Sequence, residues 1–121
     1  MAGSRMRRIN GVLREVVGSA ISSDLSDPRI GFVTVTSVET SPDLRHAKVF
    51  VSVLGDEEAR AATLAALASS HGVLQTRIAA ETRMKRTPTL TFHYDDTIEQ
   101  GVRISRLLEE EAPAEDREGT P

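Results

Sequence analysis

The side chains that most often carry out chemistry are scattered along this chain, without a recognisable catalytic or metal-binding spacing. The three histidines, His46, His71 and His93, lie far apart, and none has a second metal ligand at helical spacing within a known motif. Ser22-Ser23-Asp24 lacks the context of a nucleophile elbow, so solvation of a helix end explains it more simply. The chain has no cysteine, which excludes thiolate catalysis, disulfides and zinc-finger ligand sets.

Two acidic pairs, Glu57-Glu58 and Asp95-Asp96, could in principle bind a hard cation. Each pair stands where a helix is expected to begin, and the positive end of the helix dipole favours negative charge there. No glycine-rich phosphate loop or dinucleotide motif occurs. We therefore expect no catalysis, no cofactor and no metal site.

Positive charge is segregated along the chain. Residues 1–108 hold 14 Lys and Arg against 12 Asp and Glu, a balance of +2, whereas residues 109–121 hold 1 against 6, a balance of -5; together they give the net charge of -3. The sequence thus predicts a mildly basic domain over residues 1–108 and an acidic tail over residues 109–121. The tail lacks apolar periodicity and is expected to be disordered. Its negative charge is expected to discourage nonspecific RNA binding.

The basic residues gather in a few places, and these are the candidate contacts for a polyanion. They are Arg5, Arg7 and Arg8 near the amino terminus, Arg45 and Lys48 around the first hairpin, and Arg77, Arg83, Lys85 and Arg86 in the second half. Lysine and arginine neutralise phosphates and release counterions, which suits structured RNA. The alternative is that they solvate helix faces. Aromatic residues make up only 3% of the chain, which disfavours a base-stacking platform.

Hydrophobic periodicity indicates which elements must position these residues. Apolar residues at intervals of three and four predict a helix from about Arg7 to Leu25, which Asp27-Pro28 ends. Alternating β-branched residues predict strands over Phe32–Glu39 and His46–Leu54, and the Thr40–Asp43 turn joins them as an antiparallel hairpin.

A kinked pair of helices is predicted for the second half. Asp56 opens an alanine-rich helix that runs to Ser69, the pattern breaks at Ser70-His71-Gly72, and it resumes through about Lys85. Gly72 is expected to permit the strained backbone of the kink. A third strand follows Pro88, with Leu90, Phe92 and Tyr94 on one side, and a short helix runs from Asp96 to Leu108.

This order, α-β-β-α-kink-α-β with a short C-terminal helix, predicts an α+β domain whose helices pack on a three-stranded sheet. No apolar run is long enough for a membrane helix and no secretory signal is evident, so a cytoplasmic location is expected. The order is similar to the type II KH-like fold. Ordinary KH domains hold nucleotide backbone with a GxxG loop at the joint of the two helices, and this chain has none.

The chain resembles the ribosome-binding factor A family, in which a helical kink replaces that loop. The resemblance covers about Arg5 to Leu108 and depends on a set of short segments in the family's order: Asp27 to Gly31, Val33 to Thr36, Val38-Glu39, Ser41, Asp43-Leu44, Ala47 to Val49, Arg83 to Lys85, Pro88, Leu90 to Phe92, Asp95, Gly101 to Ile104 and Leu107.

The resemblance implies a monomeric assembly factor that binds the free 30S small ribosomal subunit near the decoding-region RNA. It further implies support of late maturation, including processing of the 5′ end of 16S rRNA, importance for growth in the cold, and release involving other assembly GTPases or initiation factors. Charge placement makes the basic residues named above the candidate ribosome-binding residues, and Ser70, His71 and Gly72 of the kink join them. Two other readings stay open: a general KH-type single-stranded RNA-binding protein, and a dimerisation module built on the Asp56–Ser69 helix.

Three residues depart from the family's pattern. Ser70 stands where alanine is usual, Gln75 where an arginine is common, and Thr82 where a larger apolar residue is usual. Serine and alanine are similar in size, so the kink should persist. The missing charge at Gln75 argues against direct RNA contact there, and Arg77 is the candidate to compensate.

Overall fold

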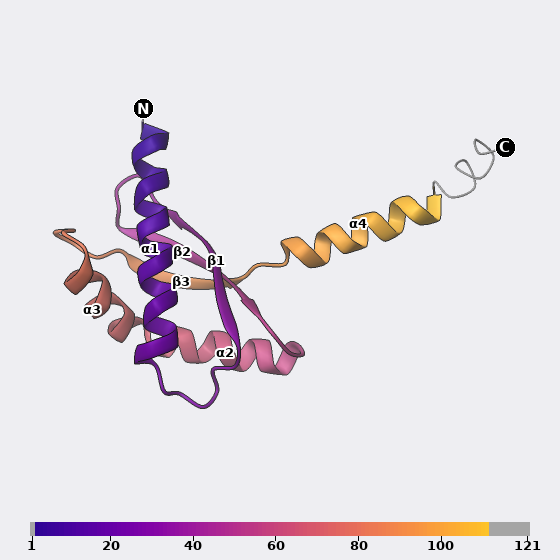
Figure 1. Ribbon diagram of the computed structural model, residues 1–121, viewed down its shortest axis with the longest axis horizontal. Coiled ribbons are helices and arrows are strands. Elements are labelled where there is room, and N and C mark those ends of the chain that lie inside the picture. The colour runs from indigo at the N-terminus through magenta and orange to yellow at the C-terminus, as the bar shows by residue number, and fades with distance from the viewer. Residues whose placement is uncertain (1, 112–121) are drawn as a thin grey trace.

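Residues 2–111 are described by the computed structural model and form four helices and one three-stranded sheet (Figure 1). In chain order the elements are α1 (Ala2–Asp24), β1 (Val33–Thr40), β2 (His46–Val53), α2 (Glu57–Ser69), α3 (His71–Glu81), β3 (Thr89–Tyr94) and α4 (Thr97–Glu111). The predicted α+β class and element order are confirmed. Residues 112–121 of the predicted acidic tail lie outside the described residues.

The sheet has the strand order β1-β2-β3 and mixes two kinds of pairing. β1 and β2 form the expected antiparallel hairpin, with Val33 opposite Val53. β3 pairs parallel to β2, with His46 opposite Thr89. A parallel neighbour needs a crossover connection, which α2 and α3 supply. As a result β2 and β3 begin at the same end of the sheet.

Three helices, α1, α2 and α3, cover one face of the sheet (Figure 1). The inward side of β2 carries Ala47, Val49, Val51 and Val53, all buried, as its alternation predicted. They pack in one core with buried side chains of the three helices, which are Leu13, Val17, Ala20, Ile21, Leu67, Leu74 and Ile78. Each large aliphatic side chain buried there contributes about 1.5–3 kcal/mol, so this layer holds the domain together.

β1 does not alternate strictly, contrary to the prediction for Phe32–Glu39. Its register with β2 shifts between Val35 and Ser37, where Thr36 is the extra residue of a β-bulge. The Thr36 hydroxyl donates a hydrogen bond to Asp95 Oδ2 at 2.6 Å, at the end of β3. That bond and hydrogen bonds from Thr97 lower the pKa of the Asp95 carboxyl. The bulge thereby ties β1 to the junction with α4.

The α1–β1 connection is fixed by a short polar network. Asp27 and Arg29 form an ion pair at 2.7 Å, as the Asp-Pro-Arg turn brings them together. The buried Thr63 hydroxyl of α2 donates to Arg29 O at 3.2 Å and accepts from Gly31 N at 3.3 Å. This segment is therefore structural, in agreement with its expected role in ending the first helix.

Several helix boundaries differ from the prediction. α1 begins at Ala2, so Arg5 lies on a helix. α3 ends at Glu81 and not near Lys85, because Thr82 adopts an extended backbone (φ -120°, ψ 165°) and its hydroxyl donates to Ile78 O. α4 runs to Glu111, three residues past Leu108.

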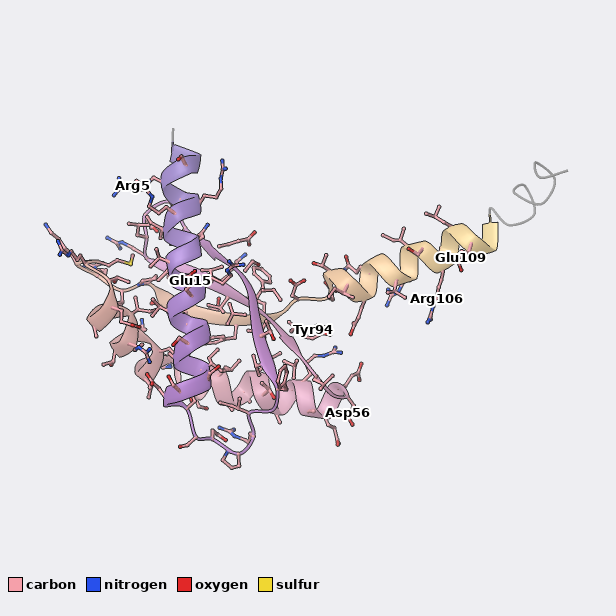
Figure 2. All side chains as sticks on the ribbon, viewed as in Figure 1. Arg5, Glu15, Asp56, Tyr94, Arg106 and Glu109 are labelled. Carbon is pink, nitrogen blue, oxygen red and sulfur yellow. The ribbon has the colours of Figure 1, made fainter. Side chains whose placement is uncertain are left out.

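α4 projects away from the other elements (Figures 1 and 2). Among the described residues, the ties of α4 to them lie in its first turn, where Glu99 Oε1 accepts from the Tyr94 hydroxyl at 2.6 Å and from Arg60 Nη2 at 3.3 Å. The Arg60 guanidinium lies over the Tyr94 ring, 3.7 Å from its centre. The carboxylate of Glu99 raises the pKa of the Tyr94 phenol. Further along, the apolar side chains of α4 are about half or more exposed: Ile98, Val102, Ile104, Leu107 and Leu108.

Candidate nucleic-acid interface

Three segments that are distant in sequence meet at the end of the sheet where β2 and β3 begin. They are the first turns of α1, the hairpin loop before β2 and the segment between α3 and β3. Parallel pairing brings the last two together, since Thr89 N donates to Arg45 O at 2.8 Å. Asn10 of α1 accepts a hydrogen bond from Thr40 N at 3.0 Å, which places the amino-terminal half of α1 beside the same hairpin.

An open cleft of about 570 Å³ lies between these segments, and we call it the basic cleft. Its rim carries five exposed cations: Arg5, Arg45, Arg83, Lys85 and Arg86. Its remaining lining residues are Ile9, Asp43, Leu44 and Met84. Figure 2 shows Arg5 at the amino-terminal end of α1, on the side of the molecule away from α4. Five of the twelve predicted ribosome-binding residues are thus brought together.

The hairpin loop that supplies Asp43, Leu44 and Arg45 is held by its own hydrogen bonds. The Asp43 carboxylate accepts from the Ser41 hydroxyl at 2.6 Å and from Arg45 N at 3.1 Å, and these bonds lower the pKa of Asp43. Leu44 has φ +62°, a conformation that a non-glycine residue adopts at a cost of about 1 kcal/mol or more. The loop therefore stores strain next to the cleft while keeping Arg45 in place.

The segment that carries Arg83, Lys85 and Arg86 is also anchored at both ends. Gln75 Nε2 donates to Pro88 O at 2.8 Å, and Pro88 is fully buried. At the other end Met84 N donates to the Thr82 hydroxyl at 3.4 Å. Gln75 is thus a positioning residue that sequence reasoning missed, because only its long-range partner reveals its role.

None of the five rim cations forms a side-chain ion pair within residues 2–111. The four ion pairs of that part of the chain involve Arg29, Arg60 and Arg77. Asp43 is the one carboxylate lining the cleft, and its Oδ1 accepts two hydrogen bonds within the hairpin loop. The cleft consequently presents an excess of positive charge to solvent, which suits a phosphate-bearing ligand.

Four other predicted basic residues, among them Arg77, lie outside the cleft lining. Arg7 and Arg8 are exposed on α1 and extend its positive charge. Lys48 is exposed on β2, where it borders a separate shallow hollow with Glu39 and His46.

The kink lies at the opposite end of α3 from the Arg83–Arg86 segment. The 11 residues of α3 separate the two by about 16 Å at 1.5 Å per residue. Ser70 joins α2 to α3 as predicted, and its hydroxyl donates to Ala66 O at 2.9 Å. His71 Nδ1 donates to Ala68 O at 2.9 Å. The kink and the basic cleft therefore form two separate surfaces.

Gly72 is not required by the backbone of the kink, contrary to the prediction. The positive backbone angles of residues 2–111 occur at Leu44 and Gly55, and a Cβ added at Gly72 would meet no atom within 4 Å. Gly72 leaves open, exposed space above the first turn of α3.

Arg77 is engaged in a polar network between α1 and α3. Its guanidinium contacts Asp24 Oδ2 at 2.8 Å and Glu81 Oε2 at 2.6 Å, and it also reaches the Ser19 and Ser23 hydroxyls. The bond from Arg77 lowers the pKa of the Asp24 carboxyl. This arrangement gives Arg77 a structural use, which weighs against the hypothesis that it compensates for Gln75 in RNA contact.

Within residues 2–111, no three His, Cys, Asp or Glu side chains lie close enough together to hold a metal ion. No helix in the same range has the length and apolar character needed to cross a membrane.

Comparison with known proteins decides the family. The family model for Ribosome-binding factor A matches residues 5–108. The chain belongs to the ribosome-binding factor A family. Among curated relatives, it is similar to Ribosome-binding factor A of Halothermothrix orenii, with 43% identity over 120 residues and 98% of each chain covered.

Solved structures of the family agree with the fold. The crystal structure of ribosome-binding factor A from Thermus thermophilus aligns with a TM-score of 0.66 and 29% identity, covering 74% of this chain and 93% of that one. A homology model of Thermus thermophilus ribosome binding factor A, fitted into the cryo-EM map of its complex with 30S, aligns with a TM-score of 0.60 and 30% identity, covering 72% of this chain and 91% of that one. The resemblance drawn from the sequence motifs is confirmed, while the contact residues stay a prediction.

Proposed function

We propose that this chain binds the free 30S small ribosomal subunit through 16S rRNA and assists late subunit maturation without catalysis. The observation that carries the proposal is the basic cleft, where three separate segments converge to present five exposed cations. Family membership supports the choice of partner, because the Thermus thermophilus relative is described in a 30S complex. Charge without base-reading side chains suits recognition of RNA by its backbone and shape.

The proposal extends to the consequences of binding. The protein acts as a monomer in the bacterial cytoplasm, supports processing of the 5′ end of 16S rRNA, matters most in the cold, and is released with the help of assembly GTPases or initiation factors. A strain lacking the gene is expected to accumulate 16S rRNA with an unprocessed 5′ end on cooling. Primer extension on rRNA from that strain measures the unprocessed fraction, and a fraction equal to that of the parent strain contradicts this role.

Sedimentation tests binding directly. Extract containing the tagged protein is run on a sucrose gradient at low salt, and fractions are probed for the tag. Migration with free small subunits, but not with whole ribosomes, is expected. A position only at the top of the gradient contradicts the proposal. An excess of unrelated single-stranded RNA is added to a parallel sample, because a general KH-type RNA-binding protein would then be displaced from the subunit.

A further inference from the structure

The basic cleft has an apolar floor beneath its charged rim. Ile9, Leu44 and Met84 come from three different segments and are each half-buried, whereas the five rim cations are exposed. Ile9 and Met84 also pack against the hydrophobic core, which fixes their positions. A ligand that fills the cleft therefore meets apolar side chains at the bottom and positive charge around the edge.

This layout does not match the surface of a closed RNA duplex. A duplex is convex and presents phosphates and hydroxyls, so it would contact the rim and leave the floor in water. An unpaired nucleotide has the complementary layout, since its base offers an apolar face and its phosphates carry the charge. The cleft volume of about 570 Å³ lies within the range of roughly 300–1,000 Å³ found for sites that enclose small ligands.

The floor and the rim are also held in fixed relative positions. The hairpin loop is braced by the hydrogen bonds of Ser41 and Asp43, and Thr89 N links it to the Arg83–Arg86 segment through Arg45 O. Leu44, in this loop, has a positive φ. A strained, well-anchored residue beside a cleft is typical of a binding site.

We propose that the basic cleft takes a single unpaired nucleotide of the bound RNA, with its base on Ile9, Leu44 and Met84 and its flanking phosphates on the cationic rim. This inference rests on the proposed function and adds the kind of RNA feature that the cleft selects. The preferred target is thus an RNA helix with an unpaired end or bulge, and not a continuous duplex.

The test compares three fluorescein-labelled RNAs by anisotropy with the full-length protein. One is a blunt hairpin, the second carries a short unpaired 3′ overhang, and the third carries the same overhang built from abasic ribonucleotides. The last two have the same phosphates and differ only in the bases. At one salt concentration the overhang with bases is expected to bind about fivefold or more tighter than the abasic overhang, because the apolar floor removes the apolar face of the base from water.

A variant with a polar floor links that preference to the cleft. Leu44→Asn with Met84→Gln conserves side-chain size, and asparagine tolerates a positive φ. It should lose the preference for the overhang with bases over the abasic overhang. Leu54→Asn with Ile98→Gln changes two exposed apolar residues outside the cleft and should retain the preference. Thermal unfolding followed by circular dichroism verifies that both variants fold.

The outcomes separate the inference from the proposed function. Equal binding of the native protein to the two overhangs overturns the inference and leaves RNA binding by charge intact. Retention of the preference in the polar-floor variant also overturns it, because the base would then lie elsewhere. Failure of the native protein to bind any of the three RNAs at low salt overturns both.

Discussion

Removing most of the cleft's positive charge should change the salt dependence of RNA binding by a predictable amount. The perturbation is Arg83→Gln, Lys85→Gln and Arg86→Gln together, which we call the cleft triple. It removes three of the five rim cations and leaves Arg5 and Arg45. All three side chains are exposed and have no ion pair within residues 2–111, so the fold should persist.

The magnitude follows from counterion release. Each phosphate neutralised on single-stranded RNA contributes roughly 0.7 to the slope of log affinity against log salt, so five cations give a slope of about -3.5. Between about 50 and 200 mM salt, such a slope lowers the affinity roughly a hundredfold. The two cations left in the cleft triple give a slope of about -1.4 and a loss of roughly sevenfold over the same range.

The assay is fluorescence anisotropy of the overhang hairpin at several salt concentrations. A matched control triple, Arg14→Gln, Arg103→Gln and Arg106→Gln, changes the net charge equally but lies on exposed parts of α1 and α4 outside the cleft. It should keep a slope close to that of the native protein. If the two triples flatten the slope equally, net charge and not the cleft governs binding, and the reasoning is refuted.

Three further predictions concern stability and the second surface. Arg77 lowers the pKa of Asp24, so this pair stabilises the fold above the ordinary carboxyl pKa, and the stabilisation is lost as pH falls through the lowered value. The unfolding free energy measured with urea should therefore fall less steeply with acid in Asp24→Asn than in the native protein. Identical pH profiles of the two proteins would contradict this. Gly72→Ala should leave the unfolding free energy unchanged or raise it by up to about 1 kcal/mol, because the added Cβ meets no atom within 4 Å. Weakened subunit binding by this stable variant would reveal contact at the kink. Unchanged binding would remove Gly72 from the interface. Ending the chain at Asp96 removes α4, whose ties among the described residues lie in its first turn: the contacts of Glu99 with Tyr94 and Arg60, and the bond from Thr97 N to Asp95. The unfolding free energy measured by chemical denaturation should fall by less than about 2 kcal/mol, and a larger loss would mean that α4 packs on the domain in solution.

Sequence periodicity was sufficient to predict the elements that have one buried face. The alternation in β2 and the three- and four-residue spacing in α1 each show which side of the element faces the core. Side chains return to the same face about every 2 residues in a strand and about every 3.6 residues in a helix. The same reasoning failed at Thr36, where the extra residue of the bulge is set by a bond to the distant Asp95. It also extended α3 too far, since Thr82 ends the helix with its own hydroxyl.

The candidate site was predicted only in composition. The sequence indicated which residues are basic, but not that parallel pairing of β2 and β3 brings Arg45 beside the Arg83–Arg86 segment. Nor could it show that Asp24, 53 residues away, engages Arg77. Long-range contacts of this kind depend on the topology of the whole fold. The role of Gln75 was hidden for the same reason, because its partner is the carbonyl of Pro88.

Cross-linking tests the central claim, that the basic cleft is the surface that meets ribosomal RNA, most directly. A benzophenone amino acid replaces Arg45 at the cleft in one variant and Arg106 on α4 in another, and each is irradiated with purified free 30S subunits. Reverse transcription of 16S rRNA then maps the cross-links. The structure predicts a defined stop from position 45 and none from position 106. A stop from position 106 alone, or from neither position while the protein still sediments with the subunit, contradicts the assignment.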